Sequence, residues 1–130
     1  MANVPQELQY TAEHEWVKTS GEGEVTVGIT DYAQGELGDI VYVELPKVGA
    51  TFGAHDVFGT VEAVKAVSEL FLPLAGEIVA VNDRLDGEPS LVNSDPYGDG
   101  WMIKLRVEGG AEAAMAGLMD AEAYRGHVGG

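Results

Sequence analysis

Short hydrophobic runs separated by turn residues occupy most of the chain and predict a protein made mainly of β-strands. Residues 9–18 and 24–30 are predicted to be two strands around a turn at Gly21–Gly23. Residues 39–45 contain isoleucine, valine and tyrosine and are followed by Pro46, which closes the run. Runs of this length bounded by glycine or proline are typical of strands in small β-proteins.

The second half of the chain continues the same pattern. Four more strands are predicted, at residues 57–64, 67–72, 77–81 and 101–107. Between the last two strands lie turn-forming dipeptides such as Asp86-Gly87 and Asp95-Pro96. Residues 82–100 are therefore predicted to be turns.

Short helices are predicted at the periphery. Asp31 and Gln34 have the spacing of a capping box and predict a short helix. Residues 111–124 are rich in alanine, glutamate, methionine and leucine and predict one or two short helices, weakened by Gly117. The last residues, 126–130, are predicted to be frayed.

The composition agrees with one small β-domain. A chain of 130 residues, 45% of them hydrophobic, is long enough for one domain with its own core. Its 18 glycines are spread without a fixed period, which favours many turns and short strands. We therefore expect residues 1–130 to form a single domain, a small β-sandwich or barrel with peripheral helices that include a C-terminal one.

The chain is strongly acidic, with 22 acidic and 7 basic residues and a net charge of −15. Nucleic acid and anionic membrane surfaces need a cationic face, so neither is an expected partner. The acidity would steer the protein toward basic patches on protein partners, although a merely solvated acidic surface explains it equally well. No targeting pattern and no window of about 18 apolar residues occurs, so we expect a soluble, cytoplasmic protein.

The residue types argue against a self-sufficient enzyme. Cysteine is absent, so any sulfur redox chemistry would come from an attached cofactor. His14, His55 and His127 have no metal-ligand spacing, and we expect no metal site. His14 stands between Glu13 and Glu15, which suggests acid–base chemistry, but no second catalytic constellation accompanies it. No nucleophile-elbow, phosphate-loop or dinucleotide-binding motif is present.

Lys65 is a lone cation among apolar residues in the segment Val61–Glu69. The other three lysines have local explanations: Lys104 alternates onto a solvent face, Lys47 belongs to a turn, and Lys18 precedes a polar stretch. The simplest interpretation of Lys65 is an exposed strand lysine whose stem lies along apolar neighbours. A lysine that is modified or catalytic is the alternative.

The strands on both sides of Lys65 would place its amine at the tip of a protruding hairpin. An exposed amine on a rigid tip suits an acyl-transferring enzyme, and it also suits a carrier whose arm visits several active sites. Local turn rules oppose this hairpin, because Val64, Lys65 and Ala66 include no glycine, asparagine or proline.

Over nearly its whole length the sequence resembles the H protein of the glycine cleavage system. The segments that carry the resemblance are, in order, Tyr10–Val17, Val27–Gln34, Leu37–Val41, Val43–Pro46, Val61–Ala66, Pro73–Gly76 and Asn93–Trp101. The resemblance implies a mainly β lipoyl/biotinyl-type barrel–sandwich hybrid with Lys65 at a hairpin tip, joined by an amide to lipoic acid. The family commonly has serine two residues before this lysine, where the chain has Ala63; the change leaves the acylated amine intact.

Four further residues match positions of the family. Glu62 and Gly76, three residues before and eleven after Lys65, match positions associated with recognition by lipoylating enzymes. An exposed strand acid and a turn glycine explain them equally well. Glu15 and Glu69 match acidic positions near the loaded arm, although ordinary surface charge is the safer interpretation. A cleft beside Lys65 would shelter the labile aminomethyl adduct from water.

The resemblance also implies a reaction cycle in which the chain is a carrier without catalytic residues. A PLP-dependent glycine decarboxylase would transfer an aminomethyl group to the lipoyl arm on Lys65. A tetrahydrofolate-dependent aminomethyltransferase would take the one-carbon unit and release ammonia, and dihydrolipoamide dehydrogenase would reoxidise the dithiol. A dithiolane supplies the reversible disulfide that a cysteine-free chain lacks. We expect the carrier to be a monomer.

Other assignments stay open at this point. A biotinyl domain shares the architecture, but its lysine usually has methionine neighbours, where this chain has Val64 and Ala66. A lipoyl domain of a 2-oxoacid dehydrogenase would be shorter and attached to a catalytic core. The chain could also be an unmodified interaction module, or a relay that passes octanoyl or lipoyl groups to other proteins.

Overall fold

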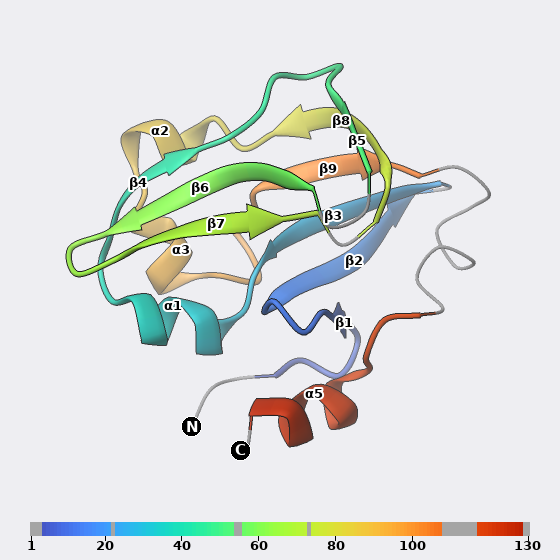
Figure 1. Ribbon diagram of the computed structural model, residues 1–130, viewed down its shortest axis with the longest axis horizontal. Helices are drawn as coiled ribbons and strands as arrows, with labels where there is room; N and C mark the ends of the chain where they lie inside the picture. The colour runs from blue at the N-terminus through green and yellow to red at the C-terminus, as the bar shows by residue number, and fades with distance from the viewer. Residues whose placement is uncertain (1–3, 22, 54–55, 73, 108–116, 129–130) are drawn as a thin grey trace.

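The computed structural model describes residues 4–21, 23–53, 56–72, 74–107 and 117–128. In this part of the chain the strands form two antiparallel sheets (Figure 1). The six-stranded sheet has the order β1-β2-β3-β9-β8-β5, with bounds Gln9–Tyr10, Glu15–Gly21, Glu24–Ile29, Ile103–Arg106, Gly76–Val81 and Thr51–Phe52. The three-stranded sheet has the order β4-β6-β7, with bounds Ile40–Glu44, Val57–Ala63 and Val67–Phe71. The helices are α1 (Asp31–Leu37), α2 (Arg84–Gly87), α3 (Leu91–Ser94) and α5 (Ala121–Val128).

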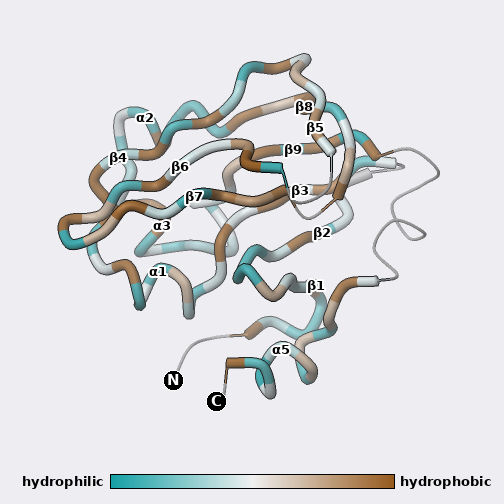
Figure 2. The backbone as a smooth tube through the Cα atoms, in the orientation of Figure 1, coloured by the Kyte–Doolittle hydropathy of each residue, from teal (hydrophilic) through white to brown (hydrophobic). Residues whose placement is uncertain are grey.

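The inner faces of both sheets share one hydrophobic core. Val27 and Leu105 come from the larger sheet, and Val43, Val61 and Leu70 come from the smaller one. All five side chains are buried. Hydrophobic and hydrophilic segments alternate along the strands (Figure 2), as expected when one face of a strand is buried. The expected mainly β fold with short helices is confirmed, as two packed sheets rather than one closed barrel in the described residues.

The strand predicted at residues 9–18 is interrupted, which corrects the sequence-based prediction. Residues 11–14 form a tight turn between β1 and β2. The Thr11 N–H donates to the Glu15 carbonyl at 3.0 Å, and the His14 N–H donates to the Thr11 carbonyl at 3.1 Å. His14 closes the turn with a φ of 68°, in the left-handed region that favours glycine. Because histidine stands there instead of glycine, the local pattern does not reveal the turn.

Helix α1 is capped by Thr30 and not by Asp31. The Thr30 hydroxyl oxygen accepts a hydrogen bond from the Ala33 N–H at 3.2 Å. The predicted partners do interact, since Gln34 Nε2 donates to Asp31 Oδ1 at 2.7 Å, but they do so inside the first turn. The predicted short helix is therefore confirmed with its cap one residue earlier.

Three short elements lie where turns or no element were predicted. Helices α2 and α3 fall within residues 82–100, and each is four residues long. Strand β5 has two residues. Elements this short show no hydrophobic period, so the sequence pattern does not distinguish them from turns.

Helix α5 packs against the N-terminal segment, and both ends of the chain lie on this side of the molecule (Figure 1). A second buried cluster joins the two ends and consists of Val4, Leu8, Tyr10, Trp16, Ala121 and Tyr124. Arg125 Nη2 also donates to the Val4 carbonyl at 3.0 Å. These contacts keep the chain helical through Val128, where fraying was predicted. Of the region 111–124, where one or two short helices were predicted, residues 111–116 lie outside the described residues, residues 117–120 are not helical, and α5 begins at Ala121.

Candidate functional site

Lys65 lies at the tip of the hairpin formed by β6 and β7 (Figure 1). Across the tip, the Ala63 N–H donates to the Ala66 carbonyl at 2.7 Å. The Val64 N–H donates to the Asp39 carbonyl at 3.0 Å, which ties the tip to the residue before β4. The Lys65 side chain is exposed, so its amine is presented on a short, hydrogen-bonded turn.

The tip turns without a left-handed residue. Among the described residues, His14 is the one non-glycine residue with positive φ, so Val64 and Lys65 have negative φ. Glycine and asparagine are favoured in hairpin turns because they adopt positive φ readily. This tip does not need them, which explains why local turn rules opposed a hairpin that the fold contains.

Apolar and acidic side chains surround the tip. Val64 is 75% exposed and Val67 is 66% exposed, and hydrophobic colour marks the end of this hairpin in Figure 2. In the small sheet, Glu62 pairs with Tyr42 on one side and with Val67 on the other. Directly paired residues share a face, so these three side chains lie together on the outer face. Exposed apolar groups gathered near Lys65 indicate a contact surface.

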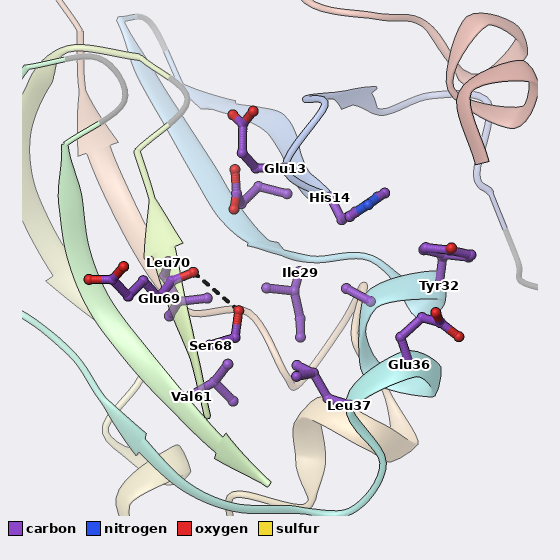
Figure 3. A pocket seen from close by; sticks show the side chains of 12 residues that line it. Glu13, His14, Ile29, Tyr32, Glu36, Leu37, Val61, Ser68, Glu69 and Leu70 are labelled. Carbon is purple, nitrogen blue, oxygen red and sulfur yellow. Dashed lines mark hydrogen bonds between the residues drawn. The ribbon is translucent and has the colours of Figure 1, made fainter. Parts of the chain in front are cut away.

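A pocket of about 250 Å³ opens between the two sheets and α1 (Figure 3). In Figure 3, Ile29 and Leu37 lie across the pocket from Val61 and Ser68. The lining residues come from the β1–β2 turn, β2, β3, α1, β6 and β7, and they are Glu13, His14, Glu15, Ile29, Tyr32, Ala33, Glu36, Leu37, Val61, Ser68, Glu69 and Leu70. The pocket therefore combines an apolar wall with an acidic end.

Glu69 lies at the rim of this pocket with its carboxylate directed away from it. Figure 3 shows the carboxylate pointing away from Ile29, whereas the side chain of the neighbouring Ser68 faces the pocket. Consecutive side chains of a strand point to opposite faces, which explains the difference. Glu69 is exposed, so in this conformation its charge faces solvent.

Glu15 is buried, which corrects the interpretation of this residue as surface charge. It is 2% exposed, and Thr11 Oγ1 donates to its Oε1 at 2.8 Å. Burial raises the pKa of the Glu15 carboxyl from 4.5 to about 8, against the opposing effect of the Thr11 hydrogen bond. A signal was present in the sequence, since Glu15 shares a strand face with the core residue Val17, two positions along β2.

His14 meets the C-terminal helix at the acidic end of the pocket. Its Nδ1 lies 2.8 Å from the Tyr124 hydroxyl, which lies 2.8 Å from Thr30 Oγ1. The ring centroids of His14 and His127 are 5.6 Å apart. Burial, followed by the nearby His127, lowers the pKa of His14. Two histidines that looked scattered in the sequence are thus neighbours, and His55 lies outside the described residues.

Gly76 and Glu62 lie in different sheets. Gly76 begins β8 and pairs with Phe52, at the side of the molecule opposite the β6–β7 tip (Figure 1). A Cβ at Gly76 would overlap the Arg106 carbonyl, so glycine allows β8 and β9 to approach. This glycine therefore belongs to a strand rather than a turn. The fold brings Glu62, but not Gly76, near Lys65.

Four residues that support the pocket were not identified from the sequence: Thr11, Thr30, Ser68 and Tyr124. Thr11 and Thr30 hold Glu15 and Tyr124 through hydrogen bonds, and Ser68 lines the pocket wall. Only Ser68 carried a sequence signal, because it alternates with Glu69 along a predicted strand. The partners of Tyr124 are about a hundred residues away in sequence, and no local pattern connects them.

In the parts of the chain that the structure describes, no group of three or more histidine, aspartate or glutamate side chains is arranged to hold a metal ion. None of the helices found there has the length and apolar character needed to cross a membrane.

Comparisons with known proteins agree on one family. A family model described as glycine cleavage H-protein matches residues 8–129. A glycine cleavage system H protein of Mycolicibacterium smegmatis is 55% identical over 129 residues, covering 98% of both chains, and that of Mycobacterium avium is 55% identical over 128 residues, covering 97% of both. A crystal structure of a glycine cleavage system H protein from Mycobacterium marinum matches with a TM-score of 0.88 at 39% identity, covering 97% of this chain and 99% of that one.

Proposed function

The chain belongs to the glycine cleavage H-protein family, whose members are lipoyl carriers rather than enzymes, and we propose that Lys65 is its lipoyl attachment residue. The observation that carries the proposal is the placement of Lys65. Its amine is exposed at a hairpin tip that backbone hydrogen bonds hold in place. An enzyme that acylates an amine needs this combination of access and order.

The residues around Lys65 fit a lipoyl arm. The pocket of about 250 Å³ begins near the hairpin, and its apolar side chains Ile29, Leu37 and Val61 suit an alkyl chain. The exposed Val64 and Val67 offer apolar contacts to the enzymes that install or use the arm.

Lys65 would hold the lipoyl group, which would supply a reversible disulfide for carrying an aminomethyl group between glycine decarboxylase and the aminomethyltransferase; dihydrolipoamide dehydrogenase would be the partner that reoxidises it. The chain's own residues bind and shelter the arm. The apolar wall excludes water from the pocket. Burial raises the pKa of the Glu15 carboxyl to about 8, and a cationic amino group in the pocket would lower it again, because a nearby positive charge favours the carboxylate.

We further infer that residues 1–130 act as one domain and as a monomer. Side chains of both sheets share one core, and the two ends of the chain share the second cluster. Sedimentation equilibrium over a range of concentrations tests the monomer, since a mass that rises with concentration would contradict it.

The experiment that tests the attachment is tryptic mapping of protein purified from its native cells. Unmodified Lys65 gives peptides 48–65 and 66–84, whereas a lipoylated Lys65 resists trypsin and gives one peptide, 48–84, with a lipoyl mass increment. A biotin increment would indicate carboxylation chemistry instead. A bare Lys65 in cells that lipoylate other proteins would contradict the proposal and favour an unmodified interaction module.

A further inference from the structure

The side chain of Lys65 folds back over the backbone of Gly38. A Cβ placed on Gly38 would lie 3.3 Å from Lys65 Cε, 3.9 Å from Cδ and 4.0 Å from Nζ. The distal half of the lysine stem therefore runs across the junction between α1 and β4. Leu37, the residue before Gly38, lines the pocket, so the end of the stem lies over a residue that adjoins the α1 wall in the chain.

The backbone at Gly38 is held firmly in an unusual conformation. Its φ of 84° and ψ of −157° lie in a region that is essentially restricted to glycine. Asn93 holds the junction from α3: its Nδ2 donates to the Gly38 carbonyl at 2.9 Å, and its Oδ1 accepts from the Ile40 N–H at 2.8 Å. The Gly38 N–H also donates to the Gln34 carbonyl at 2.9 Å. Elements α1, α3 and β4 thus meet at this glycine.

The hairpin tip is fastened to the same junction. The Val64 N–H donates to the carbonyl of Asp39, the residue after Gly38, at 3.0 Å. A backbone hydrogen bond therefore connects the residue before Lys65 to the residue after Gly38, which the end of the lysine side chain contacts. A methyl group on Gly38 would lie 3.3 Å from Lys65 Cε, closer than an ordinary van der Waals contact, so the flexible stem would have to shift away from residue 38.

We propose that Gly38 is a positioning residue for Lys65, whose bare backbone seats the lysine stem and turns it toward the α1 wall of the pocket. The contact belongs to the unmodified side chain. Its consequence for a lipoyl arm rests on the proposed function. The two parts are tested by separate measurements.

The first measurement is a nuclear Overhauser effect between the Lys65 Hε protons and the Hα protons of residue 38 in the full, unmodified chain. We expect it in the wild type. In Gly38→Ala the added Cβ takes the place of one Hα proton, so there we expect no signal from Lys65 Hε to either the Hα or the Hβ protons of residue 38. Gly49→Ala is the matched control: Gly49 also has a positive φ, of 96°, but nothing lies within 4 Å of its added Cβ. This control carries a backbone penalty of the same kind without touching Lys65, and it should keep the signal.

Asn93→Asp is a second variant that adds no atom above Gly38. It removes the donor to the Gly38 carbonyl and keeps the acceptor for Ile40, so we expect a weakened Lys65–residue 38 signal in a folded protein. This variant also covers the case in which Gly38→Ala fails to fold.

The second measurement is the change in backbone amide shifts on enzymatic lipoylation. Changes at Ala33 and Leu37 of α1 are expected in the wild type and in Gly49→Ala, and their loss is expected in Gly38→Ala. A wild type without the Lys65–Gly38 signal, or α1 shift changes that persist in both Gly38→Ala and Asn93→Asp, would overturn the inference. If the signal is present but mass spectrometry finds Lys65 resistant to lipoylation, the positioning of Lys65 by Gly38 is supported and the carrier assignment fails.

Discussion

Thr11 and Glu15 hold each other through reciprocal hydrogen bonds across the turn between β1 and β2. The Thr11 hydroxyl donates to Glu15 Oε1 at 2.8 Å and accepts from the Glu15 N–H at 3.2 Å. The pair stabilises the turn that presents His14 and keeps a carboxyl buried beside the pocket. The Thr11 side chain thus supports the local backbone, while its hydrogen bond to the Glu15 carboxyl opposes the rise in pKa that burial causes.

Folding stability should decrease with rising pH because of Glu15. The folded state raises the carboxyl pKa from 4.5 to about 8, so between these values it retains a proton that the unfolded state has lost. The stabilisation is complete below about pH 4.5 and is lost as the pH rises through 8, with a slope of at most about 1.4 kcal/mol per pH unit. Denaturant titrations of wild type and Glu15→Gln across this range measure it. If the stability difference between the two proteins is independent of pH, the carboxyl is ionised throughout.

Lys65→Arg should abolish glycine cleavage in a reconstituted system, because a guanidinium does not form the lipoyl amide. The side chain is exposed, so we expect the free energy of unfolding to change by less than about 0.5 kcal/mol. Product formation and denaturant unfolding are the two measurements. Lys104→Arg is the control and should retain full activity; retained activity in Lys65→Arg would exclude this lysine as the attachment residue.

Glu62→Gln should slow lipoylation of Lys65 by about fivefold, equivalent to ~1 kcal/mol for one charge at the edge of an interface. Glu62 lies on the outer face of the small sheet near the hairpin tip, between Tyr42 and Val67. The matched control is Glu44→Gln, which removes the same charge farther from the tip in the same sheet. Initial rates of lipoylation, followed by intact mass, distinguish the two variants. Equal rates for both would leave Glu62 without a specific role.

Tyr124→Phe should destabilise the fold by about 1–3 kcal/mol, because it removes one hydroxyl that bonds a buried partner and a half-buried one. Tyr124 is fully buried, and its hydroxyl lies 2.8 Å from both His14 Nδ1 and Thr30 Oγ1. The stacking of its ring on Tyr10 would remain. Tyr42→Phe, at an exposed tyrosine, should change the free energy of unfolding by less than about 0.5 kcal/mol. Similar losses in the two variants would show that the buried hydroxyl contributes little.

Gly28→Ala should destabilise the fold by about 1–3 kcal/mol through overpacking. Gly28 pairs with Trp16, and a Cβ on Gly28 would lie 2.8 Å from the indole ring. The ring cannot shift freely, because Trp16 Nε1 donates to the Pro96 carbonyl at 2.9 Å. Thermal and denaturant unfolding measure the loss. In contrast, Gly35→Ala on α1 has open space and should stabilise by about 0.5–1 kcal/mol, since alanine has the higher helix propensity.

The positions of most strands followed from the hydrophobic runs of the sequence. Strands β4, β6, β7 and β8 lie within one or two residues of their predicted bounds, because burial of one face imposes a visible alternation. The turn at His14 and the tip at Lys65 did not follow from local rules. The first places a non-glycine residue at positive φ, and the second makes a hairpin without any positive φ.

The sequence by itself determined the isolation of Lys65 between two strands, the absence of cysteine and the resemblance to a lipoyl carrier family. These properties depend on residue identity and order along the chain. Only the tertiary structure decided that Glu15 is buried, that His14 meets Tyr124 and His127, and that Gly38 lies beneath the Lys65 stem. The physical reason is that desolvation and side-chain contacts depend on which distant segments pack together. The local sequence pattern indicates on which face of a strand or helix a residue lies, but not which distant residues pack against that face.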